Sequence, residues 1–524
     1  MSEKKKSILH NQAWQNFIKR MPVVTPPEGH VAFKVKMAWT LAILVLYFIL
    51  TNVLIYGLGR EALDAFSSFR AILAGASGSV MHLGIGPIVT GSIIMQLFTG
   101  AGLINLDLTD ETDKAIYQGT QKFLVLVMII VEAVPQVFGY LEPSPILIDN
   151  LGTRLPLGTG IFWARTIIVI QLFIGSYLVF LMDEVISKWG IGSGISMFIA
   201  AGVSQAIFTG TFNWEAVNSS QPLSTSNPPS GVLWKSLYLS KHYSYSEMVN
   251  GGGFEQMFIQ QPNPIIALVG TIIIFLIVTY AESSRIELPL THARVRGARG
   301  RYPIRLIYAS NIPVILMAAL LANVNMFSLL LYTHPSFSGI PFFGSNWMIG
   351  KFEPNETKPS AGLAWYLSQP NGIHDWLLPL INEDKYGQYM LGHEGWMVVL
   401  RIIIYVSIMA GGSMLFAKFW IATTNMGPEK VAEQIQNSGM QIPGFRREPK
   451  AMKKVLERFI PAVTSFSGLF VGLLAAGADM TGTIGSTSGT GVLLTVGIMI
   501  RLYEDIGKEQ MVEMHPLLRE FFPD

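Results

Sequence analysis

The chain has 524 residues, of which 50% are hydrophobic and only 14% are charged. This composition excludes an ordinary soluble protein and indicates an integral membrane protein. Cysteine is absent, which excludes disulfides, thiolate metal ligands, cysteine nucleophiles and palmitoylation, and the formal net charge of +2 points to no particular partner.

Ten apolar segments follow one another along the chain and predict an all-α, polytopic membrane protein. The N-terminus that precedes them, MSEKKKSILHNQAWQNFIKRMPVV, is polar and amphipathic and is not a cleavable signal. Several segments are too short for a simple hydropathy window. They are expected at 37–56, 86–100, 121–140, 161–182, 195–209, 264–281, 306–332, 397–420, 459–478 and 490–503.

The stretch from Leu63 to Gly102 starts like a membrane helix and then breaks. Its first half carries Asp64, Arg70 and several Ser and Gly residues, and such a segment cannot face lipid. The apolar run that follows begins at Gly86–Pro87, where proline suits a helix start, and it is only about 22 Å long. A short half-helix behind a polar segment predicts either a pore or transport site, or a re-entrant loop with only a structural role.

Lysine and arginine are distributed unevenly between the loops. If the N-terminus is cytoplasmic, the loops and tails on its side hold 27 of the 37 Lys and Arg residues. The positive-inside rule then places both termini in the cytoplasm. Ten spans divide into two halves of five, and an odd number of spans makes the halves inverted. We expect an N-terminal half over 1–209, an external loop over 210–263, a C-terminal half over 264–503 and a cytoplasmic tail over 504–524.

Two long loops, 210–263 and 333–396, are expected on the external face. They are rich in Ser, Asn, Pro, Gly, Tyr and Trp, which predicts partly ordered caps without indicating a function. Two Asn-x-Ser/Thr sequons begin at Asn218 and Asn355, inside these loops. Their position agrees with the topology but adds little, because such short motifs arise by chance.

Two loops expected on the cytoplasmic face, 281–306 and 417–459, are strongly basic. The first holds six arginines and no lysine, and the second combines a short predicted helix from Pro428 with a turn that presents Arg446 and Arg447. One interpretation is that these charges only fix the orientation of the protein in the membrane, as the positive-inside rule describes. Arginine also suits phosphate and carboxylate recognition, so the alternative is docking of an RNA-rich particle, anionic lipid or an acidic protein.

The sequence contains no catalytic constellation, phosphate-binding P-loop or H-E-x-x-H metal pair, and we expect no cofactor. Glu132 is the clearest ionisable residue within a membrane segment, whereas an ion-coupled carrier concentrates several. The short segments instead carry aliphatic pairs one helical turn apart, Ile85 with Val89 and Ile195 with Ile199. Such pairs form either a hydrophobic constriction that excludes water or ordinary helix-packing positions.

Several long motifs resemble the SecY family, the channel subunit of the protein-conducting translocon, in its archaeal/eukaryotic type. The resemblance extends from about Pro22 to Leu518. The motifs that carry it are LGIGPIVTGSIIMQL (83–97), DEVISKWGIGSGISMFIAAGVSQ (183–205), YPIRLIYASNIPVIL (302–316), GFRR (444–447) and GTGVLLTVGI (489–498).

The resemblance implies two five-helix halves arranged like a clamshell around an hourglass pore. The broken segment then resembles a plug over about 60–82, hinged at Gly84, Gly86 and Pro87, and followed by the second transmembrane helix. An aliphatic ring, which could seal around a passing chain of any sequence because dispersion contacts are non-directional, is implied in the pore. Its members are Ile85, Val89, Ile195, Ile199, Ile315 and Leu494.

The resemblance also implies a lateral gate between helices two and three and helices seven and eight, with a polar cluster at Thr90, Glu132 and Asn323. A signal sequence would hold this gate open by preferring the open state. The two basic loops resemble ribosome-docking loops, where Arg446 matches an important arginine of the family. Further docking residues are expected at Arg294, Arg296, Arg299, Arg301 and Arg447.

We therefore expect the central pore-forming subunit of the Sec channel, a passive conduit rather than an enzyme. It would translocate secretory polypeptides and release transmembrane segments sideways, driven by a partner such as the translating ribosome. The family implies SecE-type and beta-type small subunits, signal peptides and nascent chains as further partners, and the plasma membrane as its location, or the ER membrane in a eukaryote. The rival classes are a small-molecule secondary transporter and an insertase or scaffold without an open pore.

Overall fold

The computed structural model describes most of the chain. Its described residues are 8–29, 31–59, 75–76, 78–100, 103–104, 106, 110–139, 141–154, 159–218, 221–292, 299–305, 307, 311–333, 349–353, 358–424, 426–437, 440–441 and 449–514.

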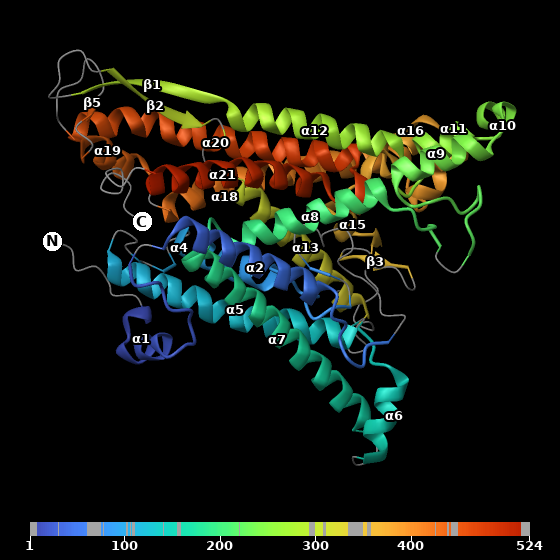
Figure 1. The fold of residues 1–524 in the computed structure, drawn as a ribbon, viewed down its shortest axis with the longest axis horizontal. Helices are drawn as coiled ribbons and strands as arrows, with labels where there is room; N and C mark the ends of the chain where they lie inside the picture. Colours follow the sequence, from blue (N-terminus) through green and yellow to red (C-terminus); the bar gives the residue numbers. More distant parts are fainter. Residues whose placement is uncertain are drawn as a thin grey trace.

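Ten long helices within the described residues form one elongated bundle (Figure 1). Eight of them are long and apolar enough to cross a membrane, and the other two are α4, which has only 15 residues, and α21. This arrangement confirms the predicted all-α membrane fold. The ten are α2 (Phe33–Thr51), α4 (Gly86–Gly100), α5 (Glu111–Gly139), α7 (Gly160–Trp189), α8 (Gly194–Phe212), α12 (Ile265–Ser283), α13 (Ile312–Thr333), α18 (Gly395–Thr423), α20 (Pro449–Thr481) and α21 (Gly489–Met514).

Three helices extend well beyond the apolar segments that announce them. Helices α5 and α20 each begin ten residues before the predicted start, and α21 continues to Met514. Hydropathy detects only the part of a helix that can face hydrocarbon, whereas these polar turns are stabilised by neighbours. The indole of Trp14 donates a hydrogen bond to Thr120 on α5, and Leu456 and Ile460 of α20 pack against α19 (Pro428–Asn437).

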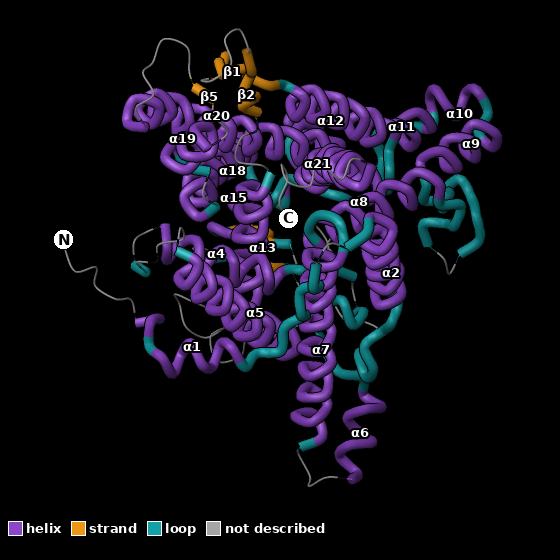
Figure 2. The backbone as a smooth tube through the Cα atoms, turned by 60° about the vertical axis from the view of Figure 1, so that its left-hand side comes forward, coloured by secondary structure: helices purple, strands orange, loops and turns teal. Residues whose placement is uncertain are grey.

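The shorter elements gather at the two ends of the bundle (Figures 1 and 2). One end, called here the basic face, carries α1 (Gln12–Lys19), α19 and the strands β1, β2 and β5. The other, called the loop face, carries most of the remaining short helices. These are α6 (Pro145–Arg154), α9 (Val232–His242), α10 (Tyr245–Asn250), α11 (Gly253–Phe258), α15 (Leu363–Leu367), α16 (Leu377–Ile381) and α17 (Glu383–Tyr386), together with strands β3 (Lys351–Phe352) and β4 (Pro359–Ala361).

The two basic loops are joined by a small sheet with the strand order β2-β1-β5. Strands β1 (Arg285–His292) and β2 (Arg299–Arg305) form an antiparallel hairpin. Strand β5 (Met440–Gln441), which follows α19, pairs with the end of β1. The predicted helix of the second basic loop is confirmed as α19, but the sequence did not reveal that the two loops share a sheet.

The described parts of the two long loops pack together as a cap on the loop face. Lys385 forms an ion pair with Glu255, and the Tyr386 hydroxyl donates to the same carboxylate at 2.5 Å. These two donors hold the pKa of Glu255 below its usual value. The ring of His374 also contacts the Ile259 carbonyl at 2.6 Å. The cap thereby ties the loop after α8 to the loop after α13.

The core runs along the whole bundle as one large hydrophobic cluster. Small residues let some helices approach almost backbone to backbone. A Cβ added to Gly468 of α20 would lie 2.8 Å from the Ala417 side chain of α18, and one added to Gly472 would lie 2.6 Å from the Met409 carbonyl. Close contacts of this kind favour packing in lipid, where helix association depends on van der Waals fit.

Candidate pore, lateral gate and docking face

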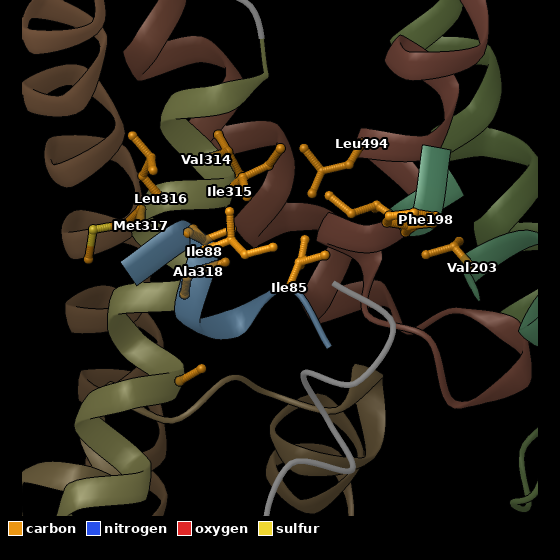
Figure 3. Packing of buried hydrophobic residues seen from close by; sticks show 14 of the residues in the cluster. Ile85, Ile88, Phe198, Val203, Val314, Ile315, Leu316, Met317, Ala318 and Leu494 are labelled. Carbon is orange, nitrogen blue, oxygen red and sulfur yellow. The ribbon is translucent and has the colours of Figure 1, made fainter. Parts of the chain in front are cut away.

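The six predicted ring residues all lie in or against the central hydrophobic cluster. Helices α8, α13 and α21 carry four of them, and the other two are Val89 on α4 and Ile85, which immediately precedes α4. Figure 3 shows Ile85, Ile315 and Leu494 lying around one region of the core. Ile85, Ile199 and Leu494 have no exposed surface, Val89 and Ile315 are also buried, and Ile195 is partly buried. The structure therefore brings together side chains that are separated by more than 400 residues in the chain.

These six side chains are all aliphatic, which suits a dry constriction better than a binding site. Ile88, Phe198 and Val314, which Figure 3 shows in the same region, belong to the same buried cluster as the ring residues. Aliphatic side chains offer neither charge nor hydrogen bonds to replace the hydration shell of an ion. An apolar constriction of this kind closes a pore by excluding water.

A cavity of about 470 Å³ lies directly beside the ring, toward the basic face. Val89, Ile195 and Ile315, three of the predicted ring residues, line part of it. The remaining wall combines apolar side chains, among them Ile312, Leu316 and Trp420, with a group of polar ones. It includes Ser92, Gln96, Lys114, Gln118, Gln121, Ser193, Ser196, Thr423 and Thr424.

Sequence reasoning did not identify this cavity. A usable signal was present, because Ser92 and Gln96 lie one turn apart on α4, and Gln118 and Gln121 share a face of α5. Polar residues at helical spacing within membrane helices indicate a face turned away from lipid. The amide of Gln121 donates to the Ser92 hydroxyl at 2.7 Å, which joins the two faces.

The end of the predicted plug is fixed to the N-terminal half. The Val80 amide donates to the Val53 carbonyl at 2.8 Å, and the Ile55 amide donates to the Gly78 carbonyl at 2.9 Å. A Cβ added to Gly175 of α7 would lie 1.9 Å from the Val80 carbonyl oxygen. Residues 78–82 are therefore part of the packed wall, while 60–74 and 77 of the predicted plug lie outside the described residues.

The three predicted hinge residues occupy a tight, buried turn that leads into α4. Gly84 has a φ of +56°, in the left-handed region that favours glycine, and its amide donates to the Met81 carbonyl. Gly86 begins α4 and Pro87 follows it, as predicted. All three residues are buried, so this turn is a compact joint.

The three predicted gate residues are hydrogen-bonded to one another. The Thr90 hydroxyl on α4 lies 2.9 Å from Glu132 Oε1 on α5, and it accepts a hydrogen bond from Asn323 on α13 at 2.9 Å. The last of these bonds joins the two halves, and Gln136 of α5 also contacts the sulfur of Met326 on α13 at 3.6 Å. Helices α4 and α5 thus lie directly against α13.

The predicted docking residues are only partly within the described chain. Arg299 and Arg301 lie on β2, in register with Thr291 and Pro289 of β1. The other four, Arg294, Arg296, Arg446 and Arg447, lie outside the described residues. Strand β5, which precedes Arg446 by a few residues in the chain, nevertheless pairs with β1, and β1 also pairs with β2.

The fold and the site together define a polytopic helical membrane protein. Its six candidate ring residues lie in or against one apolar cluster, a cavity opens beside three of them toward the basic face, and a hydrogen bond joins α4 to α13.

Comparison with known proteins gives the family. A family model described as SecY matches residues 79–503, and one described as the plug domain of Sec61p matches residues 45–78. The chain therefore belongs to the SecY family, and the predicted resemblance is confirmed. The boundary between the two matches coincides with Gly78, where the chain joins the packed wall.

Relatives and solved structures cover nearly the whole chain. The protein translocase subunit SecY of Archaeoglobus fulgidus is 44% identical over 508 residues, which are 97% of this chain and 98% of the relative. A solved protein-conducting channel is similar with a TM-score of 0.75 and 37% identity, covering 95% of this chain and 98% of the other. Sec61 in a canine ribosome–channel complex is similar with a TM-score of 0.72, 37% identity and the same coverage.

Proposed function

We propose that this chain is the pore-forming subunit of a protein-conducting channel, which passes unfolded polypeptides between the halves of its bundle. The observation that carries this proposal is the aliphatic ring beside a cavity that opens toward the basic face, called here the entrance cavity. A flexible aliphatic collar can close around side chains of any kind, because dispersion contacts have no preferred direction. The relatives named as protein translocase subunits support the same function.

The lateral gate has a second role in this proposal, the release of transmembrane segments into lipid. The Thr90–Asn323 bond is the weak point, because a single hydrogen bond contributes only about 1 kcal/mol net. A hydrophobic signal segment that replaces the contacts between α4 and α13 would shift the gate toward its open state. The channel is passive, so the driving force comes from a partner.

The end of the plug nearest α4 stays in place in this proposal. Residues 78–82 share backbone hydrogen bonds with residues 53–55, and the Val80 backbone lies against Gly175 of α7, so their release would break several contacts at once. The Ala76 amide also donates to the Met81 carbonyl at 3.2 Å, which holds Ala76 to the same turn. The buried Gly84–Pro87 turn, predicted as a hinge, therefore keeps its position when the channel opens.

We place the basic face in the cytoplasm, following the positive-inside rule. The membrane in this proposal is the plasma membrane, as the resemblance to the family implies. Small SecE-type and beta-type subunits would cover part of the apolar surface of the bundle, where α2 has only 17% of its residues buried. The translating ribosome would dock on the sheet β2-β1-β5 and the arginines around it. Sec61 in the canine ribosome–channel complex supports this choice of partner.

A small-molecule transporter is less consistent with the site, because no charged substrate ligand lies among the six ring residues. Reconstitution tests the proposal directly. Vesicles that contain this chain and its small partner, supplied with ribosomes, should take up a precursor that bears a signal sequence and protect it from added protease. A matched precursor without the signal is the control. Failure to protect the signal-bearing precursor would contradict the channel function.

Reversing the charge of Arg446 should weaken ribosome binding without affecting the fold. Arg446→Glu removes a phosphate contact and adds repulsion, so the slope of log affinity against log salt should fall by about one. Co-sedimentation with ribosomes over a salt series measures this slope. Arg458→Glu, on an exposed part of α20, is the matched control. Equal losses in both variants would show that only overall charge matters.

A further inference from the structure

Helix α8 begins against a carboxylate from the helix before it. Asp183 lies near the end of α7, and its Oδ1 accepts a hydrogen bond from the Ile195 amide at 2.9 Å. Ile195 is the second residue of α8. A Cβ added to Gly194, the first residue, would lie 2.6 Å from the Asp183 Cα, so the two backbones nearly touch there. The first amides of a helix lack partners within it, and this side chain satisfies one of them.

Helix α21 begins in the same way at the other end of the molecule. Asp479 lies near the end of α20, and its Oδ1 accepts from the Thr490 amide at 2.8 Å while its Oδ2 accepts from the Thr490 hydroxyl at 2.7 Å. Thr490 is the second residue of α21. A Cβ added to Gly489 would lie 2.0 Å from the carbonyl carbon of Ala478, the neighbour of Asp479.

The two junctions share the features that place a buried ring residue one turn into the helix. Each joins the fourth and fifth long helices of its half, each uses glycine as the first helical residue, and each places the aspartate on the second. Four residues after the bonded amide stands a fully buried ring residue, Ile199 in one half and Leu494 in the other. The α8 junction faces the basic face and the α21 junction faces the loop face, as inverted halves require.

We propose that Asp183 and Asp479 are paired positioning residues for the pore ring. Each carboxylate fixes the first turn of a pore-lining helix, one from each face of the membrane, and thereby sets where Ile199 and Leu494 stand. This inference rests on the proposed role of the ring as a seal. Neither aspartate touches the transported chain.

The fixed first turn matters because the ring residue stands only one helical turn, about 5–6 Å, beyond it. Without the acceptor, the buried amide of Thr490 or the partly buried amide of Ile195 loses its partner, and the first turn frays or tilts to find another. Helices α8 and α21 pack against each other, so a tilt of either one also displaces its neighbour. The collar then closes imperfectly.

The Asp479 carboxylate is also held from outside the junction. The Tyr405 hydroxyl on α18 donates to Oδ2 at 2.7 Å, and the Gln369 amide in the loop-face cap donates to Oδ1 at 2.7 Å. Asp479 is 2% exposed, and the four groups that donate to its carboxylate come from α18, α21 and the cap. The α21 junction is therefore the more rigid of the two, and its loss should disturb the ring more.

Two measurements on the full chain in lipid test this inference. Hydrogen–deuterium exchange reports the first turn itself, and single-channel recording in planar bilayers reports resting ion leak. In Asp183→Ala, exchange over 194–198 should be faster by about fivefold, the factor that matches the ~1 kcal/mol of a lost helix cap. In Asp479→Ala, the same should hold over 489–493. Channels formed by either variant should leak ions at rest. The control variant Asp149→Ala, at an exposed position of α6, should show neither faster exchange nor ion leak.

Conservative variants separate positioning from folding. Asp183→Asn and Asp479→Asn keep an Oδ1 acceptor, so they should restore slow exchange and a tight resting state, and they remain informative if an alanine variant fails to fold. Unchanged exchange in the alanine variants would overturn the inference. So would faster exchange without leak, if Ile85→Ser in the same bilayers does leak. If Ile85→Ser is also tight, the proposed ring function fails, and this inference fails with it.

Discussion

Replacing Ile85 and Ile199 together by serine should make the resting channel conduct ions. Each substitution removes about three carbon atoms from the dry constriction, worth roughly 2 kcal/mol of apolar burial. A change of that size raises the wetted fraction of the constriction on the order of 30-fold per site. Both side chains are fully buried in the central cluster, so the new hydroxyls would be placed among apolar groups. Conductance across planar bilayers in the absence of any precursor measures the effect.

General loosening of the core is the competing explanation, and one residue separates the two. Ile168 on α7 is also fully buried in the same cluster, but it is not part of the ring. Ile168→Ser should therefore lower the free energy of unfolding by roughly 3 kcal/mol or more, as a serine at a ring position also would. Unlike the ring variant, it should cause little ion leak. Similar conductance in the Ile168 and ring variants would mean that the ring residues are ordinary packing positions.

Much of the bundle could be predicted because hydropathy and helix signals are local. The Gly86–Pro87 start, the 15-residue α4 and the helix from Pro428 all agree with the sequence. The ring residues, in contrast, followed from a resemblance. Spacing alone shows Ile85 one turn from Val89, but it says nothing of Leu494, which reaches the same region only when ten helices pack.

The parts that the sequence did not predict depend on contacts between distant segments. The two residues of β5 have no strand pattern of their own, and they become a strand only beside β1, about 150 residues earlier in the chain. The polar turns of α5 are helical because α1 and the residues just before it cover them: Trp14 of α1 donates to Thr120 at 3.1 Å, and His10 contacts Asp113 at 2.7 Å. The roles of the aspartates at the two helix junctions could not be predicted either, because no local sequence pattern marks Asp183 as the partner of an amide twelve residues away.

A covalent link between Thr90 and Asn323 should abolish translocation altogether. These side chains form the hydrogen bond that joins α4 to α13 across the gate, at 2.9 Å. The chain contains no cysteine, so Thr90→Cys combined with Asn323→Cys introduces a single thiol pair without background. Oxidation, or a short bifunctional maleimide where the geometry disfavours a disulfide, then holds the two halves together. A hydrogen bond worth about 1 kcal/mol yields to a signal sequence, whereas a covalent bond does not.

The matched control links two helices of the same half. Gln121 on α5 donates to Ser92 on α4 at 2.7 Å, so Ser92→Cys with Gln121→Cys offers an equally close pair beside the entrance cavity. Because α4 and α5 belong to the same half, this link leaves the gate free. Protease protection of a signal-bearing precursor should persist with the control link and disappear with the gate link, and reduction of the gate disulfide should restore it. Full translocation through a channel whose gate link is complete would exclude opening between α4 and α13 as a step in transport.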